Sequence, residues 1–548
     1  MSERRASDVF VECLEAEGVK YVFGIPGEET VDLNESLSRS SIAFVPVRHE
    51  QGGAYMADMY GRLTRRAGVC LGTLGPGATN LVTAVADAFL DRAPLVALTG
   101  QADLERMHKE SHQYIDIVSL MRPITKWNAR LNSAQIIPEV VRKAFKVAQA
   151  QKPGPTHLEL PEDVMEAPLD AQPLPVRVGI RRPQPSEEEL EQAAELIRSA
   201  RAPIALVGNG IARVGAAEEL RDFSHATGIP VAETFMGKGV LDYEDEHCVG
   251  TVGLQSRDYA LAGFEDADVV ITVGYDLVEH APANWNPERD KRIICIDTVS
   301  PEVDEHYITE VDLIGDMAHI LSWIGEHCPD ARTTEVSNRL NDIVMSHFQG
   351  ARDDDHFPAH PPRVLWDLRQ ALGREDMLIS DVGLHKLWIA RMFPAHEPNT
   401  VIIANGFAGM GFALPTAIAA KLVHPERSVV TVNGDGGFLM NCQELETASR
   451  LGTAIVNVIW ENQQFGSILW KQEKKFKRHF GVDFTNPDFV RLAESFGLRG
   501  WRCESIDDFS TYLDQALALD QPSVIVVPID YSLDIALSEE LGTETVAT

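Results

Sequence analysis

The feature that most constrains the fold is a series of short, uninterrupted apolar runs. Residues 269–273 and 455–459, for example, are rich in β-branched side chains, and amphipathic segments such as 187–199 separate the runs. A continuously apolar strand is buried on both faces, as in a parallel sheet covered by helices. We therefore predict an α/β fold with doubly wound parallel sheets, repeated along the chain. Further runs of this kind are 69–74, 95–98, 204–207, 293–296, 429–432 and 523–527.

Two proline-containing stretches divide this pattern. Residues 161–189 are rich in proline, and residues 347–363 combine proline, glycine and an acidic run. Composition shifts of this kind are common at domain boundaries. We predict three domains, at about 1–165, 188–335 and 358–548, in a chain of 548 residues that is too long for one core.

The net charge limits the partners. The chain has 49 Lys and Arg against 82 Asp and Glu, a formal charge of −33, which disfavours binding to nucleic acid. An anionic ligand would need a metal ion, helix N-termini or a few basic side chains near it. The seven cysteines include no CxxC pair, and neither a signal-peptide core nor a stretch of 18 apolar residues occurs. We therefore expect a cytoplasmic protein without a membrane segment, a disulfide framework or a cysteine-based zinc site.

The strongest motif lies in the third domain. The apolar run 429–432 leads into Gly434-Asp435-Gly436-Gly437, and a second run ends at Glu461-Asn462-Gln463-Gln464. Asp435 and Asn462 are 462 − 435 = 27 residues apart, about the length of one strand–helix–strand unit. Both should therefore lie at the carboxyl ends of neighbouring parallel strands, where ligands bind in open α/β sheets.

The chemistry of this motif suits Mg²⁺ or Ca²⁺ bound to a diphosphate. Asp435, the amide oxygen of Asn462 and the main-chain carbonyl of Gln464 are oxygen ligands that hard cations prefer, and the glycines free N–H groups for phosphate. A glycine turn followed by an unrelated asparagine is the plainer reading, and the paired placement disfavours it. No GxxxxGK[ST] motif occurs, and "VGNGIARVG" at 207–215 departs from GxGxxG, so we interpret it as a strand–helix turn.

A second motif stands near the start of the chain. The apolar run 42–47 ends at Arg48-His49-Glu50, with Gly52 and Gly53 close behind. Two readings are open: a solvated strand end that caps the next helix, or a catalytic carboxylate at the carboxyl edge of a sheet. The motif alone favours the first, and the metal motif far away in sequence favours the second.

These motifs resemble those of thiamine diphosphate (thiamine pyrophosphate) enzymes, whose signature is GDG, a spacer and NN. Here Glu461 replaces the first Asn and Asn462 keeps the second. The stretches 22–30, 47–64 and 68–100 look like the pyrimidine-binding domain of acetolactate synthases, and 108–127, 274–287 and 474–497 resemble the catabolic, FAD-independent type. The resemblance implies that 1–165 is the pyrimidine-binding domain, 188–335 the central domain and 358–548 the diphosphate- and metal-binding domain. It also implies that FAD is absent, because Gly274-Tyr275-Asp276-Leu277 stands where the biosynthetic branch has GxRFDDR.

The resemblance implies roles for individual residues. Glu50 is the carboxylate that pairs with the cofactor's pyrimidine ring, Gln113 and His112 face the substrate, and Met410 is the wedge that bends the cofactor. Asp435, Asn462 and the Gln464 carbonyl hold Mg²⁺. The cofactor-binding positions are Pro26, Leu384, His385, Ala408, Met410, Gly434, Gly436, Gly437, Asn462 and Gly466.

The implied reaction is the decarboxylation of pyruvate and its ligation to a second 2-oxoacid, giving 2-acetolactate and CO₂. A different thiamine diphosphate 2-oxoacid decarboxylase, lyase or carboligase is the alternative, since Ser467 replaces a usual Met and Glu28 and Glu29 occupy a turn that is often small. A non-catalytic thiamine diphosphate-binding protein would lack the glutamate or the metal motif, and both are present. The resemblance also implies a homodimer or homotetramer, in which the first domain of one subunit faces the third domain of another.

Overall fold

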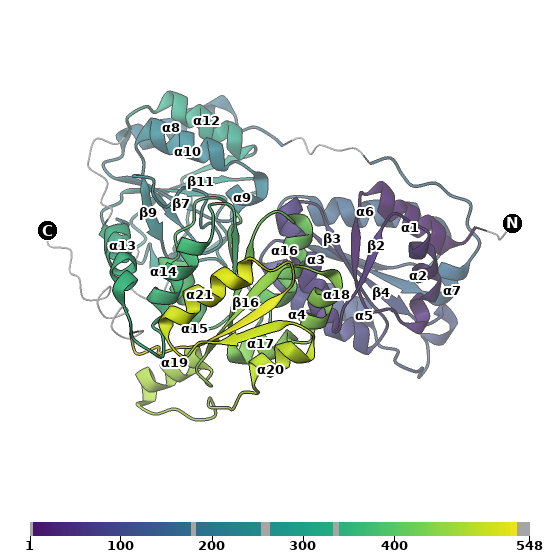
Figure 1. Cartoon of the computed structure of the whole chain (residues 1–548). Helices are drawn as coiled ribbons and strands as arrows, with labels where there is room; N and C mark the ends of the chain where they lie inside the picture. The colour runs from purple at the N-terminus through teal and green to yellow at the C-terminus, as the bar shows by residue number, and fades with distance from the viewer. Residues whose placement is uncertain (1–3, 177–181, 254–262, 332–338, 534–548) are drawn as a thin grey trace.

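The computed structural model describes residues 4–176, 182–253, 263–331 and 339–533. The chain forms three parallel six-stranded sheets flanked by helices, which confirms the predicted doubly wound α/β architecture (Figure 1). Short 3₁₀ turns lie between these elements, at Glu28–Thr30, Leu104–Arg106, Arg122–Ile124, Ala134–Ile136, Pro282–Asn284 and Ala351–Asp353. Within the described residues, no helix is long and apolar enough to cross a membrane.

The first sheet has the strand order β2-β1-β3-β4-β6-β5. Its central strands β3 and β4 are buried along their whole length, as the apolar runs predict. The strands are β1 (Tyr21–Gly24), β2 (Ala43–Pro46), β3 (Gly68–Gly72), β4 (Leu95–Gln101), β5 (Trp127–Arg130) and β6 (Pro155–Pro161). The helices are α1 (Ala6–Ala16), α2 (Val31–Ser38), α3 (Glu50–Thr64), α4 (Pro76–Leu90), α5 (Ile117–Met121), α6 (Ile137–Gln149) and α7 (Glu162–Glu166).

The second sheet has the order β12-β11-β10-β7-β8-β9, which is the order of dinucleotide-binding folds read from its other edge. Its strands are β7 (Pro203–Val207), β8 (Val231–Glu233), β9 (Cys248–Thr251), β10 (Val269–Val273), β11 (Arg292–Asp297) and β12 (Val311–Ile314). Its helices are α8 (Glu187–Ser199), α9 (Gly210–Val214), α10 (Ala217–Thr227) and α12 (Met317–His327), and α13 (Arg339–Gly350) leads on toward the third sheet.

The third sheet, β14-β13-β15-β16-β18-β17, repeats the strand order of the first. The two sheets are therefore versions of one unit. The strands are β13 (Met377–Ser380), β14 (Val401–Ile403), β15 (Val429–Gly434), β16 (Ile455–Glu461), β17 (Arg499–Arg502) and β18 (Ser523–Pro528). The helices are α14 (Pro361–Ala371), α15 (Leu384–Met392), α16 (Ala413–Val423), α17 (Asp435–Asn441), α18 (Glu444–Leu451), α19 (Gly466–Phe476), α20 (Phe489–Ser495) and α21 (Ile506–Leu517).

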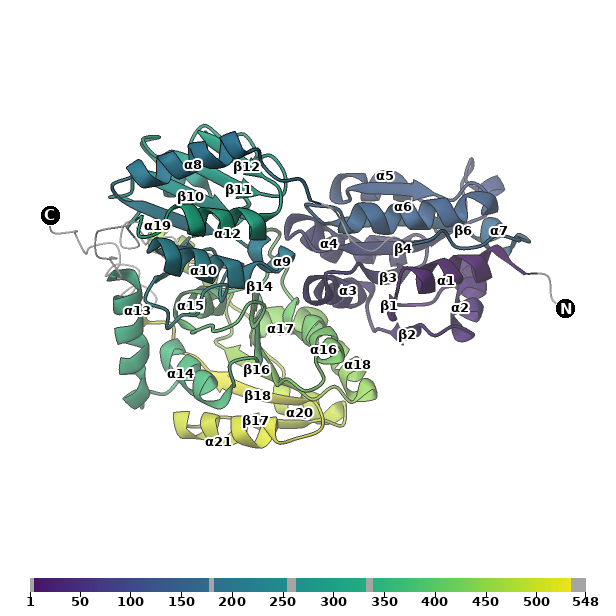
Figure 2. The ribbon, with the colours of Figure 1, turned by 90° about the horizontal axis from the view of Figure 1, so that it is seen from above.

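The first and third sheets share one hydrophobic core. Helix α3 packs against α16 at the junction, and buried residues of both units belong to the same cluster; Figure 2 shows the two units meeting there. Beside this core, the buried Arg62 contacts Asp58, Asp87 and Asp91, and Asp91 Oδ1 accepts the Gly406 N–H at 2.6 Å. The first and third units therefore pack together as one continuous body and are not independent domains joined only by a linker.

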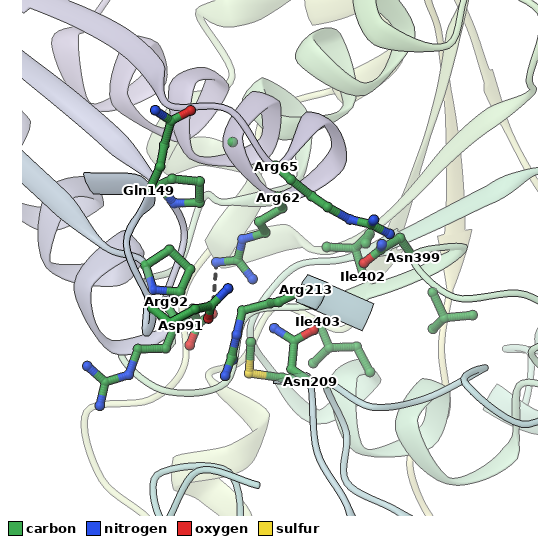
Figure 3. A pocket seen from close by; sticks show the side chains of 16 residues that line it. Arg62, Arg65, Asp91, Arg92, Gln149, Asn209, Arg213, Asn399, Ile402 and Ile403 are labelled. Carbon is green, nitrogen blue, oxygen red and sulfur yellow. Dashed lines mark hydrogen bonds and ion pairs between the residues drawn. The ribbon is translucent and has the colours of Figure 1, made fainter. Parts of the chain in front are cut away.

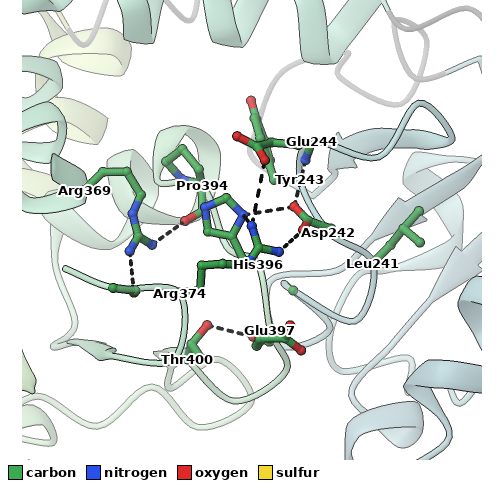
Figure 4. A network of polar contacts seen from close by, with 12 residues as sticks. Leu241, Asp242, Tyr243, Glu244, Arg369, Arg374, Pro394, His396, Glu397 and Thr400 are labelled. Atoms are coloured by element: carbon green, nitrogen blue, oxygen red, sulfur yellow. Dashed lines mark hydrogen bonds and ion pairs between the residues drawn. The ribbon is translucent and has the colours of Figure 1, made fainter. Parts of the chain in front are cut away.

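The second sheet is joined to the third unit by a shared core and by a polar network (Figure 4). Asp242 contacts both Arg374 and His396, with 2.9 Å between Asp242 Oδ1 and His396 Nδ1. Arg374 Nη1 also lies 3.2 Å from His396 Nδ1. The network fixes the 242–247 turn of the second unit against the third.

The segment that leads to Glu50 differs from the buried strand that its apolar run predicts. Strand β2 covers only Ala43–Pro46 and lies at the edge of its sheet, where Ala43 and Pro46 are exposed and Val45 is buried. An edge strand has one sheet neighbour, so its outer positions stay in contact with solvent. Glu50 is the first residue of α3, and the ring of His49 caps that helix by accepting the Gln51 N–H at 3.1 Å.

Candidate active site

The loop that follows β15 places a carboxylate at the carboxyl edge of the third sheet. Asp435 is the first residue of α17 and is 1% exposed. Its Oδ1 accepts the Gly436 N–H at 2.9 Å. Its Oδ2 accepts the N–H groups of Asn462 and Gln463, at 3.0 and 2.6 Å, and the Asn486 side-chain amide at 2.9 Å. The carboxylate is therefore held in place by donors from three segments.

The end of β16 lies beside it. Strands β15 and β16 pair in parallel, with Gly434 opposite Trp460, so Asp435 and Asn462 follow neighbouring strand ends, as their spacing predicts. Gln463 has a positive φ of 59°, which turns the chain sharply after Asn462. The Gln464 carbonyl accepts the Gly466 N–H at 2.9 Å, and the next helix, α19, begins there.

These segments line a cleft of about 220 Å³ at the carboxyl edge of the third sheet. All of its lining residues come from the third unit. Those that the sequence predicted are Leu384, His385, Ala408, Met410, Gly434, Asp435, Gly436, Gly437, Asn462, Gln464 and Gly466. The others are Val382, Gly383, Phe465, Ser467, Ile468 and Tyr531.

His385 is buried beneath the glycine loop. It is 1% exposed, and burial lowers its pKa to about 4. Among the described residues its Nε2 has no hydrogen-bond partner, and a Cβ at Gly434 would lie only 3.2 Å from its Cε1. A buried nitrogen without a partner is costly unless a ligand satisfies it. An anion in the cleft would favour the protonated ring, in which both nitrogens donate.

A buried carboxylate fixes the loop that carries Met410. Asp381 follows β13, is fully buried, and accepts the N–H groups of Val382, Gly411 and Phe412 at 2.7, 3.0 and 3.3 Å. Burial raises its pKa to about 7. Ala408, in the same loop, has a positive φ of 57°, a conformation that non-glycine residues adopt only when their surroundings enforce it. The Met410 loop is therefore built before any ligand binds.

Glu50 lies in the first unit, at the N-terminal end of α4. It is 6% exposed, and its Oε2 accepts the Asn80 side-chain amide at 2.9 Å. A Cβ at Gly77 would lie 3.2 Å from its Oε1. A buried carboxylate beside a helix N-terminus is electrostatically stabilised, so the structure supplies both a dry pocket and an orienting partner for this group.

The other residues predicted in the first unit are near Glu50 or at the surface. Gln113 has a positive φ of 57°, and its carbonyl oxygen would lie 2.6 Å from a Cβ at Gly75, at the start of the same helix α4. His112 and Pro26 are exposed. In the described part of the chain, none of Pro26, Glu50, His112 and Gln113 lines the cleft of the third unit. The predicted residues of the first unit and the cleft of the third unit are therefore separate in this chain, and we call these two places the half-sites.

Gly52 and Gly53 allow two neighbouring segments to pack closely against the first turn of α3. A Cβ at Gly52 would come within 2.8 Å of Glu444 Oε1, and one at Gly53 within 3.1 Å of the Phe23 carbonyl oxygen. Glu444 Oε1 also accepts the N–H groups of Arg48 and His49, each at 3.0 Å. Gly52 therefore allows the Glu444 carboxylate of the third unit to approach α3, and Gly53 allows strand β1 of the first unit to do so.

Sequence reasoning missed the residues that hold the predicted ones in place: Asn80 beside Glu50, Asn486 beside Asp435, and Asp381 behind the Met410 loop. Asp381 had a usable signal, because it follows a buried strand just as Asp435 does. Asn80 lies in the interior of a helix and Asn486 in a loop, so no local pattern marks either of them.

A second, smaller cavity, of about 60 Å³, lies where the three units meet and contains none of the predicted residues. Arg62 and Arg65 of the first unit, Asn209 and Arg213 of the second, and Asn399 and Ile402 of the third line it (Figure 3). Its cations are largely engaged internally, since Arg213 binds Asp276 at 2.9 Å and Arg62 binds its three aspartates. We therefore place the active site in the cleft beside Asp435.

The turn after β7 is filled by protein. Gly208 and Gly210 pack against the backbone of Gly274. The buried Glu279 accepts the Asn209 N–H at 3.1 and 3.2 Å through its two oxygens, and burial raises the pKa of this carboxyl group to about 8. In a dinucleotide site the pyrophosphate would bind to backbone N–H groups of this turn, and Glu279 already accepts the Asn209 N–H. The geometry thus favours the structural turn that the sequence indicated.

Comparison with known proteins agrees with this pair of half-sites. The chain matches three family models: "Thiamine pyrophosphate enzyme, N-terminal TPP binding domain" at residues 4–120, the "central domain" at 190–324, and the "C-terminal TPP binding domain" at 381–527. The first covers Glu50 and the third covers Asp435. The class is therefore that of thiamine pyrophosphate enzymes, with all three domains present in their usual order.

Similar proteins of known activity identify the family within this class. The chain is 36% identical to the acetolactate synthase of Bacillus subtilis, over 98% of this chain and 95% of that protein. It is 34% identical to the catabolic acetolactate synthase of Raoultella terrigena, over 96% and 95%, and 31% identical to the acetolactate synthase isozyme 2 large subunit of Escherichia coli, over 95% and 94%. The chain belongs to the acetolactate synthase family of thiamine pyrophosphate enzymes.

Proposed function

We propose that this chain is a thiamine diphosphate- and Mg²⁺-dependent enzyme that decarboxylates pyruvate and joins the remaining two-carbon unit to a second 2-oxoacid. With pyruvate as acceptor, the products are 2-acetolactate and CO₂. The observation that carries the proposal is full-length similarity to acetolactate synthases, at 36% identity over 98% of the chain. The two half-sites described above support it independently.

The cleft of the third unit fits a metal-bound diphosphate. Asp435, the Asn462 amide and the Gln464 carbonyl form an oxygen donor set that suits Mg²⁺. The unpartnered Nε2 of His385 and the N–H groups of Gly434 and Gly437 suit phosphate oxygens. Gly434 and Gly436 leave no room for a side chain, since added Cβ atoms would lie within 3.2 Å of His385 and 2.9 Å of Phe465. These residues would hold the cofactor, and Met410 would support its middle.

Glu50 is the proposed proton-transfer residue. When bound, thiamine diphosphate supplies the thiazolium ring that accepts the electron pair released on decarboxylation. Glu50 would hold a proton at the ring nitrogen of the aminopyrimidine, which tunes the basicity of the neighbouring amino group. Asn80 orients Glu50, and its burial keeps water from competing for that proton. Gln113, beside the same helix end, would face the substrate, and we assign His112 and Pro26 to the same face.

We further propose that the enzyme uses no flavin. Glu279 accepts the Asn209 N–H in the turn after β7, and Asp276, in the stretch that replaces GxRFDDR, is bound by Lys152 and Arg213 at 2.7 and 2.9 Å. The purified enzyme should therefore show no flavin absorption band and should need no FAD for turnover. A stoichiometric flavin band would contradict this proposal without affecting the assignment to the family.

The proposed assembly is a homodimer, or a homotetramer built from such dimers. Around the third-unit half-site, Phe407, Leu439 and Met440 are 45%, 36% and 47% exposed, and Ile115 near Gln113 is 38% exposed. Exposed apolar side chains at both half-sites are typical of surfaces that a second copy covers. We also propose a cytoplasmic location, because all seven cysteines, each within the described residues, are free thiols.

The decisive experiment supplies pyruvate, thiamine diphosphate and Mg²⁺ to the purified enzyme. We expect CO₂ release and a product that yields acetoin on acid treatment. Glu50→Gln should reduce turnover by at least about 100-fold, the usual scale of a lost general acid–base group, while leaving cofactor binding measurable. Release of CO₂ without acetoin would identify the enzyme as another 2-oxoacid decarboxylase instead of a synthase. Full turnover in Glu50→Gln would refute the role of the glutamate.

A further inference from the structure

The acidic segment that precedes α14 folds against the carboxyl end of β18 in the third sheet. The Ala359 N–H donates to the Pro528 carbonyl at 2.9 Å, and the Asp530 N–H donates to the Ala359 carbonyl at 3.0 Å. Segments that are about 170 positions apart are thus locked together at the backbone, and they bring His356, His360 and Asp530 to one place.

The three side chains converge on a small volume. His356 Nε2 lies 3.1 Å from Asp530 Oδ2, and His360 Nε2 lies 3.9 Å from the same oxygen. The two imidazoles are stacked, with 4.1 Å between centroids and 6° between planes. All three atoms lie within 4.8 Å of one another. Tetrahedral ligands of Zn²⁺, with bonds of 2.0–2.1 Å, lie about 3.3 Å apart, so a metal requires only small movements here.

The neighbouring polar groups already orient this set for metal binding. Asp354 Oδ2 lies 2.7 Å from His360 Nδ1, and Asp354 Oδ1 accepts the His356 N–H at 3.0 Å. A carboxylate only accepts, so Nδ1 of His360 carries the proton and Nε2 presents its lone pair. Asp530 Oδ1 accepts the Ser532 N–H at 2.8 Å, which leaves Oδ2 directed at the histidines. A carboxylate–histidine pair behind the ligand is the usual outer support of metal sites.

Two other clusters in the described residues are weaker candidates. Asp242, Glu244 and His396 surround Arg374, whose guanidinium already supplies the positive charge (Figure 4). In the set His225, Asp245 and His247, the Asp245 oxygen 3.6 Å from His247 Nδ1 already accepts the His247 N–H at 2.9 Å. The set built on Asp530 has in addition the carboxylate of Asp354, which orients His360.

We propose that His356, His360 and Asp530 form a binding site for a divalent transition-metal ion, with Zn²⁺ the best match and water as the fourth ligand. Two imidazoles disfavour Mg²⁺ and Ca²⁺, so this site is chemically distinct from the one at Asp435. The bound ion clamps the start of the third domain to the end of β18. Tyr531, the next residue after Asp530, lines the cofactor cleft, so the ion also steadies one wall of that cleft.

The test titrates Zn²⁺ into the untagged full-length enzyme by calorimetry, with Mg²⁺ and thiamine diphosphate saturating. We expect one Zn²⁺ per chain and a Zn²⁺-dependent rise in melting temperature. Co²⁺ in place of Zn²⁺ should give the visible bands of a histidine-ligated ion.

The variants discriminate between the clusters. The double variant His356→Ala/His360→Ala should lose this binding and the Zn²⁺-dependent melting shift, and Asp354→Asn should weaken binding about 10- to 100-fold. The matched control His225→Ala/His247→Ala should bind as the wild type does. Binding that persists in the first variant, or is lost in the control, would overturn the proposal. The melting temperature measured without Zn²⁺ shows whether each variant is folded. If the alanine variant does not fold, His356→Gln/His360→Gln replaces it.

Discussion

Glu50 depends on one neighbour more than on any other. The carboxylate is nearly buried, and the Asn80 amide is the side-chain donor that orients it, at 2.9 Å. The sequence identified Glu50 because it interrupts an apolar pattern and matches a family motif. Asn80 breaks no pattern, since a polar residue on a helix near its N-terminus is ordinary. Its role depends on a contact between residues 30 positions apart, which only the folded structure provides.

Asn80→Ala should lower kcat more than it changes KM. A hydrogen bond to a charged group contributes about 1.5–3 kcal/mol, which corresponds to roughly 10- to 150-fold in rate. Because Asn80 acts through Glu50, the pH profile of kcat should also shift. Steady-state rates across pH, with Thr79→Ala on the exposed side of the same helix as control, check this. A variant with wild-type kcat and pH profile would show that the amide is only structural.

At the scale of elements, the central strands were predictable and the peripheral ones were not. Strand β10 begins and ends where its apolar run does, and helix α8 matches its amphipathic segment. Burial on both faces forces such strands to be uniformly apolar, so the sequence records them. Strand β2 has an equally apolar sequence, but it lies at the sheet edge, and of its four residues Val45 is the buried one. The fold class follows from the first kind of element and tolerates errors in the second.

The N-terminus of α18 carries a testable contact between units. Glu444 is fully buried, accepts the Arg48 and His49 N–H groups, and has a pKa raised by burial to about 7, from 4.5. Between those two pH values the folded state holds a proton that the unfolded chain releases. The stability contributed by this group is therefore complete below about pH 4.5 and is lost as the pH rises to 7.

Glu444→Gln removes that titration. We expect the melting temperature of the variant, relative to wild type, to rise steadily from pH 4.5 to 7. The corresponding change in the free energy of unfolding is roughly 3 kcal/mol. Glu446→Gln, which breaks a surface pair with Arg450 on the same helix at 3.0 Å, should run parallel to wild type. A constant difference between Glu444→Gln and wild type across this pH range would show that Glu444 is ionised throughout.

At the scale of the whole molecule, the two half-sites lie on different units of one chain. The cleft beside Asp435 is lined only by the third unit, and Glu50 lies beside α4 in the first. The sequence placed both motifs correctly on sheet edges, because strand ends are a local property. It could not place these strand ends relative to each other, since that depends on the packing of α3 against α16. Family resemblance supplied the expectation of a shared site.

Complementation tests the shared site directly. Glu50→Gln and Asp435→Asn should each be inactive alone, because each removes one half of every site. Co-expressed in equal amounts and assembled at random, half of the dimers are mixed, and each mixed dimer regains one intact site of two, so about a quarter of wild-type activity should return. If Glu50 served its own chain, no combination would restore activity. The double variant Glu50→Gln/Asp435→Asn mixed with either single variant stays inactive in both cases and controls for contamination.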